Sequence, residues 1–228
     1  MIVDFHTHFY PPSYLDAQRA GKGRVRMTTD ADGNPEIHYP GDYNVAVPGH
    51  RDILYRDGAL AAAGIDRQVM SFTTPGTHFE EPDLAVELAG RVNDDFAGLA
   101  RERGAKMTAL GTLPLNDPAA SVKELERVVK TLELPGAMVF SNVNGTPLAD
   151  RRYWPLYEAA DAMGCVLMIH PAHPLGVAAM TDYGLMPLVG FPFDTTLAVA
   201  HLVFAGVMHR YPRIRGVFGH LGGALPYI

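Results

Sequence analysis

The chain has 228 residues, 47% of them hydrophobic, which is enough for one substantial core. Its formal net charge of −6 argues against nucleic-acid and anionic-membrane partners, because such partners require a basic surface. The only cysteine, Cys165, excludes a disulfide within the chain, and no basic segment precedes the short apolar N-terminus. No uninterrupted apolar run approaches a membrane span. These features favour a cytoplasmic protein that acts on a small molecule.

The first predicted element is a strand that begins at the N-terminus and carries two histidines. Side chains alternate along a strand, so Asp4, His6 and His8 project to one side and Phe5 and Thr7 to the other. Neutral imidazoles are common ligands of zinc and similar ions. The His-x-His pair therefore indicates half of a metal site, although two ordinary surface histidines would give the same short pattern.

From Ile65 onward, apolar runs typical of strands alternate with amphipathic helical patterns, which indicates a parallel sheet built from βαβ units. Further strands are expected at 67–72, 106–113, 137–140, 166–169 and 214–218. Helices are expected from about 82 to 99, 118 to 132, 152 to 163 and 195 to 208. Asp117 and Asp194 are the predicted N-caps of the second and fourth of these helices.

Two segments interrupt this alternation, at about 9–50 and 172–193. The first is rich in glycine and proline, so we expect a loop-like insertion and not a second domain. The whole chain, 1–228, is then a single domain with six strand positions.

Six parallel units fit either an open nucleotide-binding sheet or most of an eight-unit barrel. The nucleotide-binding sheet requires a glycine-rich turn after its first strand, and here that turn contains His6, His8 and Pro11 instead. Histidines also follow the predicted fifth and sixth strands, where barrel enzymes place their active sites. The pattern favours an α/β fold of the (β/α)₈ barrel type.

Of ten histidines, most are expected to have no role in a site. His38, His50 and His78 lie in polar or glycine- and proline-rich segments, which favours solvent exposure. His201 and His209 lie in or near the last helix. His170 directly follows a strand, which makes it a third candidate metal ligand, and His173 has left that strand and is either a substrate contact or a plain loop residue.

His220 lies in the glycine-rich segment 219–223, where close backbone approach and unusual dihedral angles are allowed. We assign it as a general acid or base, although spacing alone does not separate this role from that of a metal ligand.

Four segments together resemble the amidohydrolase superfamily, and within it the amidohydrolase-2 branch that includes aminocarboxymuconate-semialdehyde and resorcylate decarboxylases. They are Asp4-Phe5-His6-Thr7-His8, residues 154–160, His170-Pro171 and residues 219–226. The resemblance covers essentially the whole chain, and the ordered set is far more specific than a lone His-x-His.

The resemblance implies a distorted (β/α)₈ barrel with one divalent metal ion, Zn²⁺ or in some members Mn²⁺, and no organic cofactor. His6, His8 and His170 would be the metal ligands, and His220 would handle a proton. The lysine or glutamate that bridges two metals in other members has no counterpart at residues 137–141, so one metal is expected. Dimers or tetramers are also implied.

One departure concerns an aspartate that the family pattern places after an eighth strand as a further metal ligand. This sequence ends at Ile228, after its sixth predicted strand. We therefore expect a barrel truncated after that strand, as in part of a longer polypeptide.

The function expected from this resemblance is metal-dependent decarboxylation of an unsaturated or aromatic carboxylic acid. The candidate substrate contacts are Arg51 for a carboxylate, Phe191 and Phe193 for an unsaturated ring, and His173. One alternative is a metal-dependent hydrolase, lactonase or hydratase of the same superfamily. Another is a non-catalytic fragment or pseudoenzyme.

Overall fold

The computed structural model describes residues 1–39, 42–174 and 176–228. Pro40 and Gly41 of the first predicted insertion, and Leu175 of the second, lie outside the described residues.

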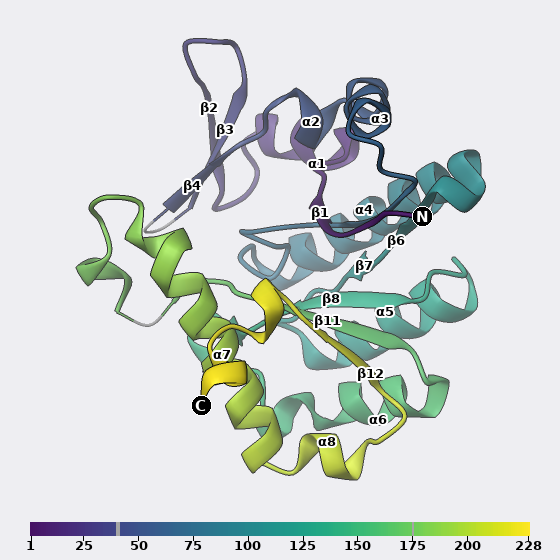
Figure 1. Cartoon of the computed structure of the whole chain (residues 1–228), viewed down its shortest axis with the longest axis vertical. Coiled ribbons are helices and arrows are strands. Elements are labelled where there is room, and N and C mark those ends of the chain that lie inside the picture. Colours follow the sequence, from purple (N-terminus) through teal and green to yellow (C-terminus); the bar gives the residue numbers. More distant parts are fainter. Residues whose placement is uncertain (40–41, 175) are drawn as a thin grey trace.

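The six strand positions lie side by side in chain order, and all their pairings are parallel. One sheet contains β1 (Val3–His8), β5 (Arg67–Ser71) and β6 (Met107–Ala109). The other contains β7 (Gly111–Thr112), β8 (Gly136–Phe140), β11 (Val166–His170) and β12 (Arg215–Phe218). Within the described residues, β1 and β12 each pair on one side only, so the strands form an open array and not a closed barrel (Figure 1).

The predicted third strand, 106–113, is interrupted at Leu110, and its two parts pair with different neighbours. Asn93, on the helix Pro82–Arg103 that precedes this strand, explains the break. Its Nδ2 donates to the carbonyl oxygen of Thr112 at 2.9 Å, and its Oδ1 accepts from the Thr112 amide at 2.7 Å. A buried side chain therefore satisfies backbone groups that a continuous strand would offer to a neighbour.

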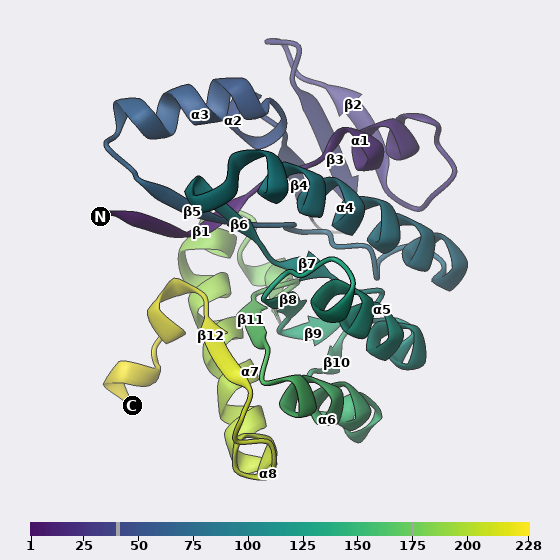
Figure 2. The ribbon, with the colours of Figure 1, turned by 90° about the vertical axis from the view of Figure 1, so that its right-hand side faces the viewer.

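Helices cover the outer faces of the strands (Figure 2). They are α3 (Ile53–Ala62), α4 (Pro82–Arg103), α5 (Pro118–Lys130) and α6 (Trp154–Met163). The predicted N-cap of α5 is confirmed, because the Asp117 carboxylate accepts from the Ala120 amide at 2.9 Å. Gly164 ends α6 in the left-handed conformation. One-turn 3₁₀ segments lie at 104–106, 151–153, 177–179, 220–222 and 225–227.

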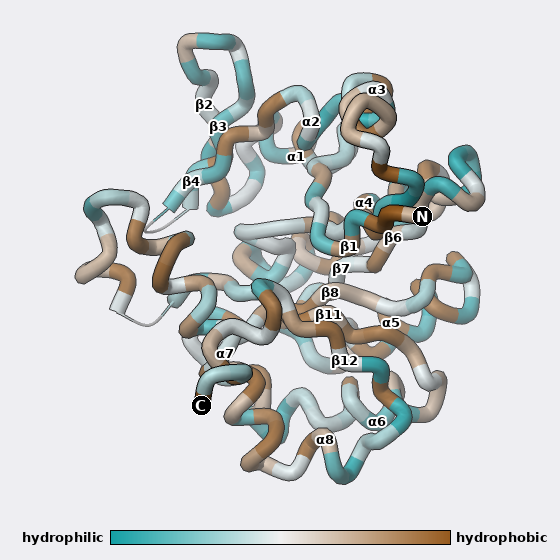
Figure 3. Tube along the Cα trace, in the orientation of Figure 1, coloured by the Kyte–Doolittle hydropathy of each residue, from teal (hydrophilic) through white to brown (hydrophobic). Residues whose placement is uncertain are grey.

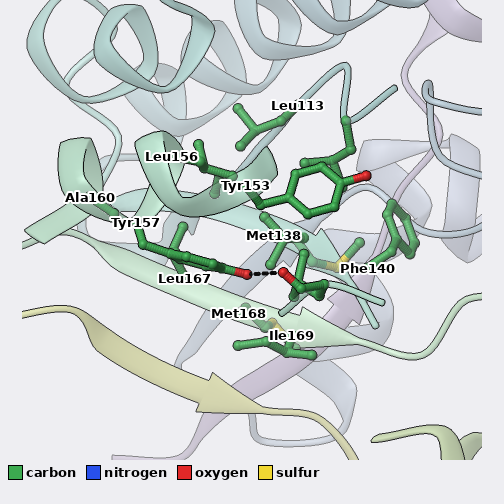
Figure 4. Close-up of a cluster of buried hydrophobic side chains, with 14 of the residues drawn as sticks. Leu113, Met138, Phe140, Tyr153, Leu156, Tyr157, Ala160, Leu167, Met168 and Ile169 are labelled. Carbon is green, nitrogen blue, oxygen red and sulfur yellow. Dashed lines mark hydrogen bonds between the residues drawn. The ribbon is translucent and has the colours of Figure 1, made fainter. Parts of the chain in front are cut away.

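The main core fills the space between these helices and the strands. Leu167 on β11 lies beneath Tyr157 of α6, and Met138 on β8 and Met168 on β11 belong to the same cluster (Figure 4). The buried Tyr157 hydroxyl donates to the carbonyl oxygen of Leu148 at 2.7 Å, which satisfies the one polar atom of that side chain. A second core cluster lies between β5, α4 and α1 (Pro12–Arg19).

The first insertion is more regular than its composition suggests. It contains α1 (Pro12–Arg19), α2 (Pro48–Arg51) and an antiparallel sheet of β2 (Arg26–Thr29), β3 (Pro35–Tyr39) and β4 (Asp42–Val45). The expectation of a loop was wrong here, because buried Ile37, Tyr14 and Leu15 give the insertion a share of the second core cluster. In Figure 1 it lies beyond the carboxyl ends of the central strands.

The last long helix begins earlier than predicted. A π-helical turn (Met186–Gly190) leads directly into α7 (Phe191–Phe204), and α8 (Val207–Arg210) follows after Gly206. Asp194 is therefore inside the helix and not its N-cap. Its carboxylate accepts from the Ser141 hydroxyl and from the Ala172 amide, so it links α7 to the loop after β11.

The continuous helical segment Met186–Phe204 is also long and apolar enough to cross a membrane, by length and composition alone. The sequence expectation concerned an uninterrupted apolar run, and Asp194 interrupts this segment. In the structure, 39% of its most apolar 18-residue window is buried inside the fold.

Candidate metal centre

Three histidines meet at the carboxyl ends of β1 and β11. Each of His6, His8 and His170 offers a ring nitrogen, and these three atoms lie within 4.8 Å of one another. The Nε2 atoms of His6 and His8 are 3.1 Å apart. Ligands on a zinc tetrahedron lie about 3.3 Å apart when each Zn–N bond is near 2.0–2.1 Å, so the spacing of this pair suits one ion. The predicted set of three histidines is thus brought together.

Neighbouring groups fix the tautomers of two of these rings. The Ser71 hydroxyl donates to the carbonyl oxygen of Thr7 at 3.0 Å, so it must accept from Nδ1 of His8, also at 3.0 Å. Nδ1 of His170 donates to the carbonyl oxygen of Pro171 at 2.7 Å. In both rings Nε2 then keeps its lone pair, which is the form that a metal ligand requires.

The electrostatics of the cluster favour neutral rings. Burial, together with the nearby His6 ring, lowers the pKa of His170 to about 3. Burial and the His170 and His6 rings hold the pKa of His8 well below its ordinary value. Burial and His220 likewise lower the pKa of His6. Neutral imidazoles at neutral pH are ready to bind a cation without first losing a proton.

His220 lies beside the three rings without belonging to their nitrogen cluster. Its ring centroid is 5.0 Å from that of His6 and 5.7 Å from that of His170. The residue has a φ of 52°, an uncommon conformation for a non-glycine residue. Among the described residues its Nδ1 is buried without a hydrogen-bond partner, and burial lowers the pKa of the ring.

Glycines allow this approach, as the sequence suggested. A Cβ on Gly219 would lie 3.3 Å from Cε1 of His6, and a Cβ on Gly223 would lie 2.2 Å from the carbonyl oxygen of Pro192. The second contact is far too short, so Gly223 is required where the segment crosses the start of α7.

The histidines line a cavity of about 190 Å³. Phe191 lines it too, with its ring 6.0 Å from that of His220. Other walls come from the insertion and the loop after β5: Tyr10, Asn44, Val45, His50, Thr73 and Thr74. Asn44 Nδ2 donates to the carbonyl oxygen of Thr74 at 2.9 Å and thereby ties the insertion to this loop.

The other candidate substrate contacts lie elsewhere. The Arg51 guanidinium donates to the carbonyl oxygen of Ala46 and to Asn34, and the residue lines a separate surface cavity. Phe193 is 60% exposed and does not line the histidine cavity. His173 lines a larger neighbouring cavity.

Two histidines expected in solvent are buried or part of the site. His50 lines the histidine cavity, and burial lowers its pKa. His78 is only 3% exposed. Both lie in segments whose sequence lacks helix or strand periodicity, so only the tertiary packing of the insertion and of the loop after β5 reveals their positions.

The parallel α/β array with a histidine cluster at the carboxyl ends of its strands defines the class of protein: it is an α/β protein of the barrel type with a cluster of potential metal ligands. A family model described as amidohydrolase matches residues 3–227. The chain belongs to this amidohydrolase family, in the amidohydrolase-2 branch that the sequence motifs indicated.

Named relatives in this family are decarboxylases. The chain is 31% identical to 2-amino-3-carboxymuconate-6-semialdehyde decarboxylase of Dictyostelium discoideum, over 99% of this chain and 64% of the relative. It is 30% identical to gamma-resorcylate decarboxylase of Rhizobium sp., over 83% of this chain and 62% of the relative. The chain thus spans less than two thirds of the length of these relatives.

Solved structures of decarboxylases also match the chain. The crystal structure of 5-carboxyvanillate decarboxylase from Sphingomonas paucimobilis matches with a TM-score of 0.83 and 27% identity, over 99% of this chain and 69% of that chain. A dihydroxybenzoic acid decarboxylase from Polaromonas sp., with bound manganese and the inhibitor 2-nitroresorcinol, matches with a TM-score of 0.79 and 25% identity, over 100% of this chain and 68% of that chain.

Proposed function

We propose that this chain carries the site of a metal-dependent decarboxylase for an aromatic or unsaturated carboxylic acid. The observation that carries the proposal is the cluster of three ring nitrogens, two with Nε2 kept free by Ser71 and Pro171, directly beside His220. The decarboxylase names of its relatives support the reaction type.

His6, His8 and His170 would hold one divalent ion. We favour Zn²⁺ because the donors are all imidazoles, and the manganese in a related structure makes Mn²⁺ the second candidate. When bound, such an ion supplies positive charge that binds and polarises the oxygens of an acid.

His220 is then the group that moves a proton. In decarboxylation, the carbon–carbon bond to the carboxylate breaks, carbon dioxide leaves, and the electron pair stays on the ring or alkene carbon, which takes up a proton. The lowered pKa of His220 keeps its ring largely neutral at neutral pH, so one nitrogen can accept a proton and the other can donate one. Phe191 would pack against the unsaturated part of the substrate.

The test is carbon dioxide release from hydroxybenzoates and a muconate-type acid by protein stripped with a chelator and reloaded with Zn²⁺ or Mn²⁺. We expect release only after reloading, and we expect His170→Ala to bind less metal by elemental analysis. Hydrolysis of a lactone panel without any decarboxylation would favour the hydrolase alternative. Loss of both activities with no bound metal would favour a non-catalytic fragment.

We also infer that the protein is soluble and cytoplasmic. Its partner would be a small carboxylic acid, and it would bind neither nucleic acid nor a membrane. The net charge of −6 supports this inference. So does Asp194, whose buried carboxylate is hydrogen-bonded inside the fold in the middle of the apolar helical segment. Recovery of the expressed chain in the membrane fraction would contradict it.

A further inference from the structure

A second cavity, of about 580 Å³, adjoins the histidine cavity and shares Thr74 with it. We call it the outer cavity. Loops that follow β5, β8 and β11 line it, and the insertion contributes Arg24 and Tyr39. Its volume is in the range of small-molecule sites. The catalytic role proposed above uses none of this space.

The chemistry of the outer cavity is largely apolar and without unmatched charge. Its apolar lining includes Pro75, Phe79, Pro174 and Val177, and no acidic residue of the described chain lines it. The one guanidinium, Arg24, is already paired with Glu81 outside the lining. A neutral, mostly apolar group therefore fits this cavity better than a second carboxylate does.

His78 is one of the polar residues that line the outer cavity, along with Asn142, Asn144 and His173. Its ring lies 4.8 Å from that of Phe140, and Phe140 in turn lies 6.1 Å from His170, so one aromatic ring separates His78 from the metal centre. A Cβ on Gly76 would be 2.6 Å from Nδ1 of His78, so the backbone of Gly76 covers that edge of the ring. The edge that carries Nε2 is the one left for the cavity.

The surroundings of Nδ1 also indicate where the proton of this neutral ring resides. Within the described part of the chain, Nδ1 is buried without a hydrogen-bond partner. An N–H at that position would lose its hydrogen bond to water and gain no acceptor, so the tautomer with the proton on Nε2 is favoured. Burial lowers the pKa of His78 to about 4, which keeps the ring neutral at neutral pH.

We propose that the outer cavity is a second subsite of the active site, which holds an apolar substituent of the substrate whose oxygen accepts a hydrogen bond from Nε2 of His78. The preferred substrates are then aromatic acids that bear an acyl or similar group away from the reacting carboxylate. The inference rests on the proposed decarboxylase function, because it names the substrate class of that site.

The test compares 2-hydroxybenzoate with derivatives that carry an ethyl or an acetyl group at each open ring position. Val177→Phe fills the outer cavity and should lower kcat/KM for the substituted acids about tenfold or more, with little change for the unsubstituted acid. His78→Phe removes Nε2 and should lower kcat/KM about fivefold for the acetyl acids only, the usual effect of one lost hydrogen bond. Val86→Phe, on the exposed surface of α4, is the matched control.

Calorimetric binding of the corresponding phenols separates this inference from the reaction itself. If no acid is decarboxylated but the two variants weaken phenol binding in the same selective pattern, the subsite stands and the proposed function fails. If both variants fold, by circular dichroism, and affect unsubstituted, ethyl and acetyl compounds alike, the subsite is wrong whatever the activity.

Discussion

At the scale of single residues, a substitution of His220 should impair proton transfer without affecting metal binding. His220→Asn removes a group beside the three proposed ligands but leaves their ring nitrogens in place. We expect kcat for decarboxylation to fall by a factor on the order of 10² to 10⁴, the usual contribution of a general acid or base. Metal content, by elemental analysis, should not change.

A matched control is His209→Asn, at the exposed end of α8, which should leave both quantities unchanged. If His220→Asn loses its metal together with its activity, the residue is a ligand and our assignment of roles is wrong.

His78 should make the fold less stable in acid. Its pKa is about 4 in the folded chain and near 6.5 when unfolded, so the folded state binds fewer protons between these values. Its contribution is fully present above pH 6.5 and is lost as pH falls toward 4, with a total on the order of 3 kcal/mol. Urea unfolding at pH 7.5 and 4.5 measures it. His78→Phe should lose distinctly less stability across this interval, and an equal loss would refute the assignment.

The residue scale also shows how far the sequence predicts the site. The clustering of His6, His8 and His170, with His220 beside them, was predictable because each lies at or near the end of a strand with a clear apolar pattern. Arg51 was predicted as a substrate contact, but α2 directs its guanidinium to Ala46 and Asn34. A contact made by a loop or insertion depends on packing between segments distant in sequence, which no local pattern records.

At the scale of elements, the pairing of β8 with β11 depends on Gly136. Gly136 lies opposite Val166, and a Cβ there would be 1.9 Å from the Val166 carbonyl oxygen. Gly136→Ala must therefore shift the two strands, and we expect a loss of roughly 3 kcal/mol or more in the free energy of unfolding. Gly98→Ala, where a Cβ meets nothing within 4 Å in the interior of α4, should instead stabilise by up to about 1 kcal/mol. Urea titration of both variants measures the change in the free energy of unfolding. Equal effects of the two substitutions would contradict this account.

Asp194 connects α7 to the loop that follows His170. Its buried carboxylate accepts from Ser141 and from the Ala172 amide, and Ser141 donates its own amide to the His170 carbonyl oxygen at 2.8 Å. Asp194→Ala should cost about 2 kcal/mol in the free energy of unfolding, because two donors lose a charged acceptor. Asp194→Asn should cost less. A double-mutant cycle with Ser141→Ala measures their coupling, and additive losses would show that the two do not act together.

Strands and helices with strong periodicity were predictable to within a few residues, as α5 and β11 illustrate. The exceptions have physical causes. Asp194 resembles an N-cap in sequence, but its carboxylate accepts hydrogen bonds from Ser141 and Ala172, which lie outside the helix. It therefore does not cap the helix, which begins three residues earlier, at Phe191. The insertion looks like a loop because its glycines and prolines dominate, while the few apolar residues that anchor its sheet, such as Ile37, give no periodic signal.

At the scale of the whole molecule, both outer strands have an unpaired edge within the described residues. Apolar side chains are exposed near these edges and along α7, where Figure 3 shows strongly hydrophobic segments. Phe5 on β1 is 47% exposed, and Phe204 on α7 and Leu221 are 90% and 93% exposed. Open strand edges beside apolar surface favour association.

We therefore predict that this chain self-associates in solution as its concentration rises, as light scattering coupled to size exclusion would measure. Phe5→Lys and Phe204→Lys should each shift the equilibrium toward the monomer, because a charge next to a strand edge or on an apolar helix face must be desolvated when that surface is covered. Val86→Lys is the matched control: Val86 is 42% exposed, and it lies on α4, which packs against β6 and β7 in the middle of the array. If all three variants dissociate equally, general repulsion between charged chains explains the effect, and the open edges are not the contact.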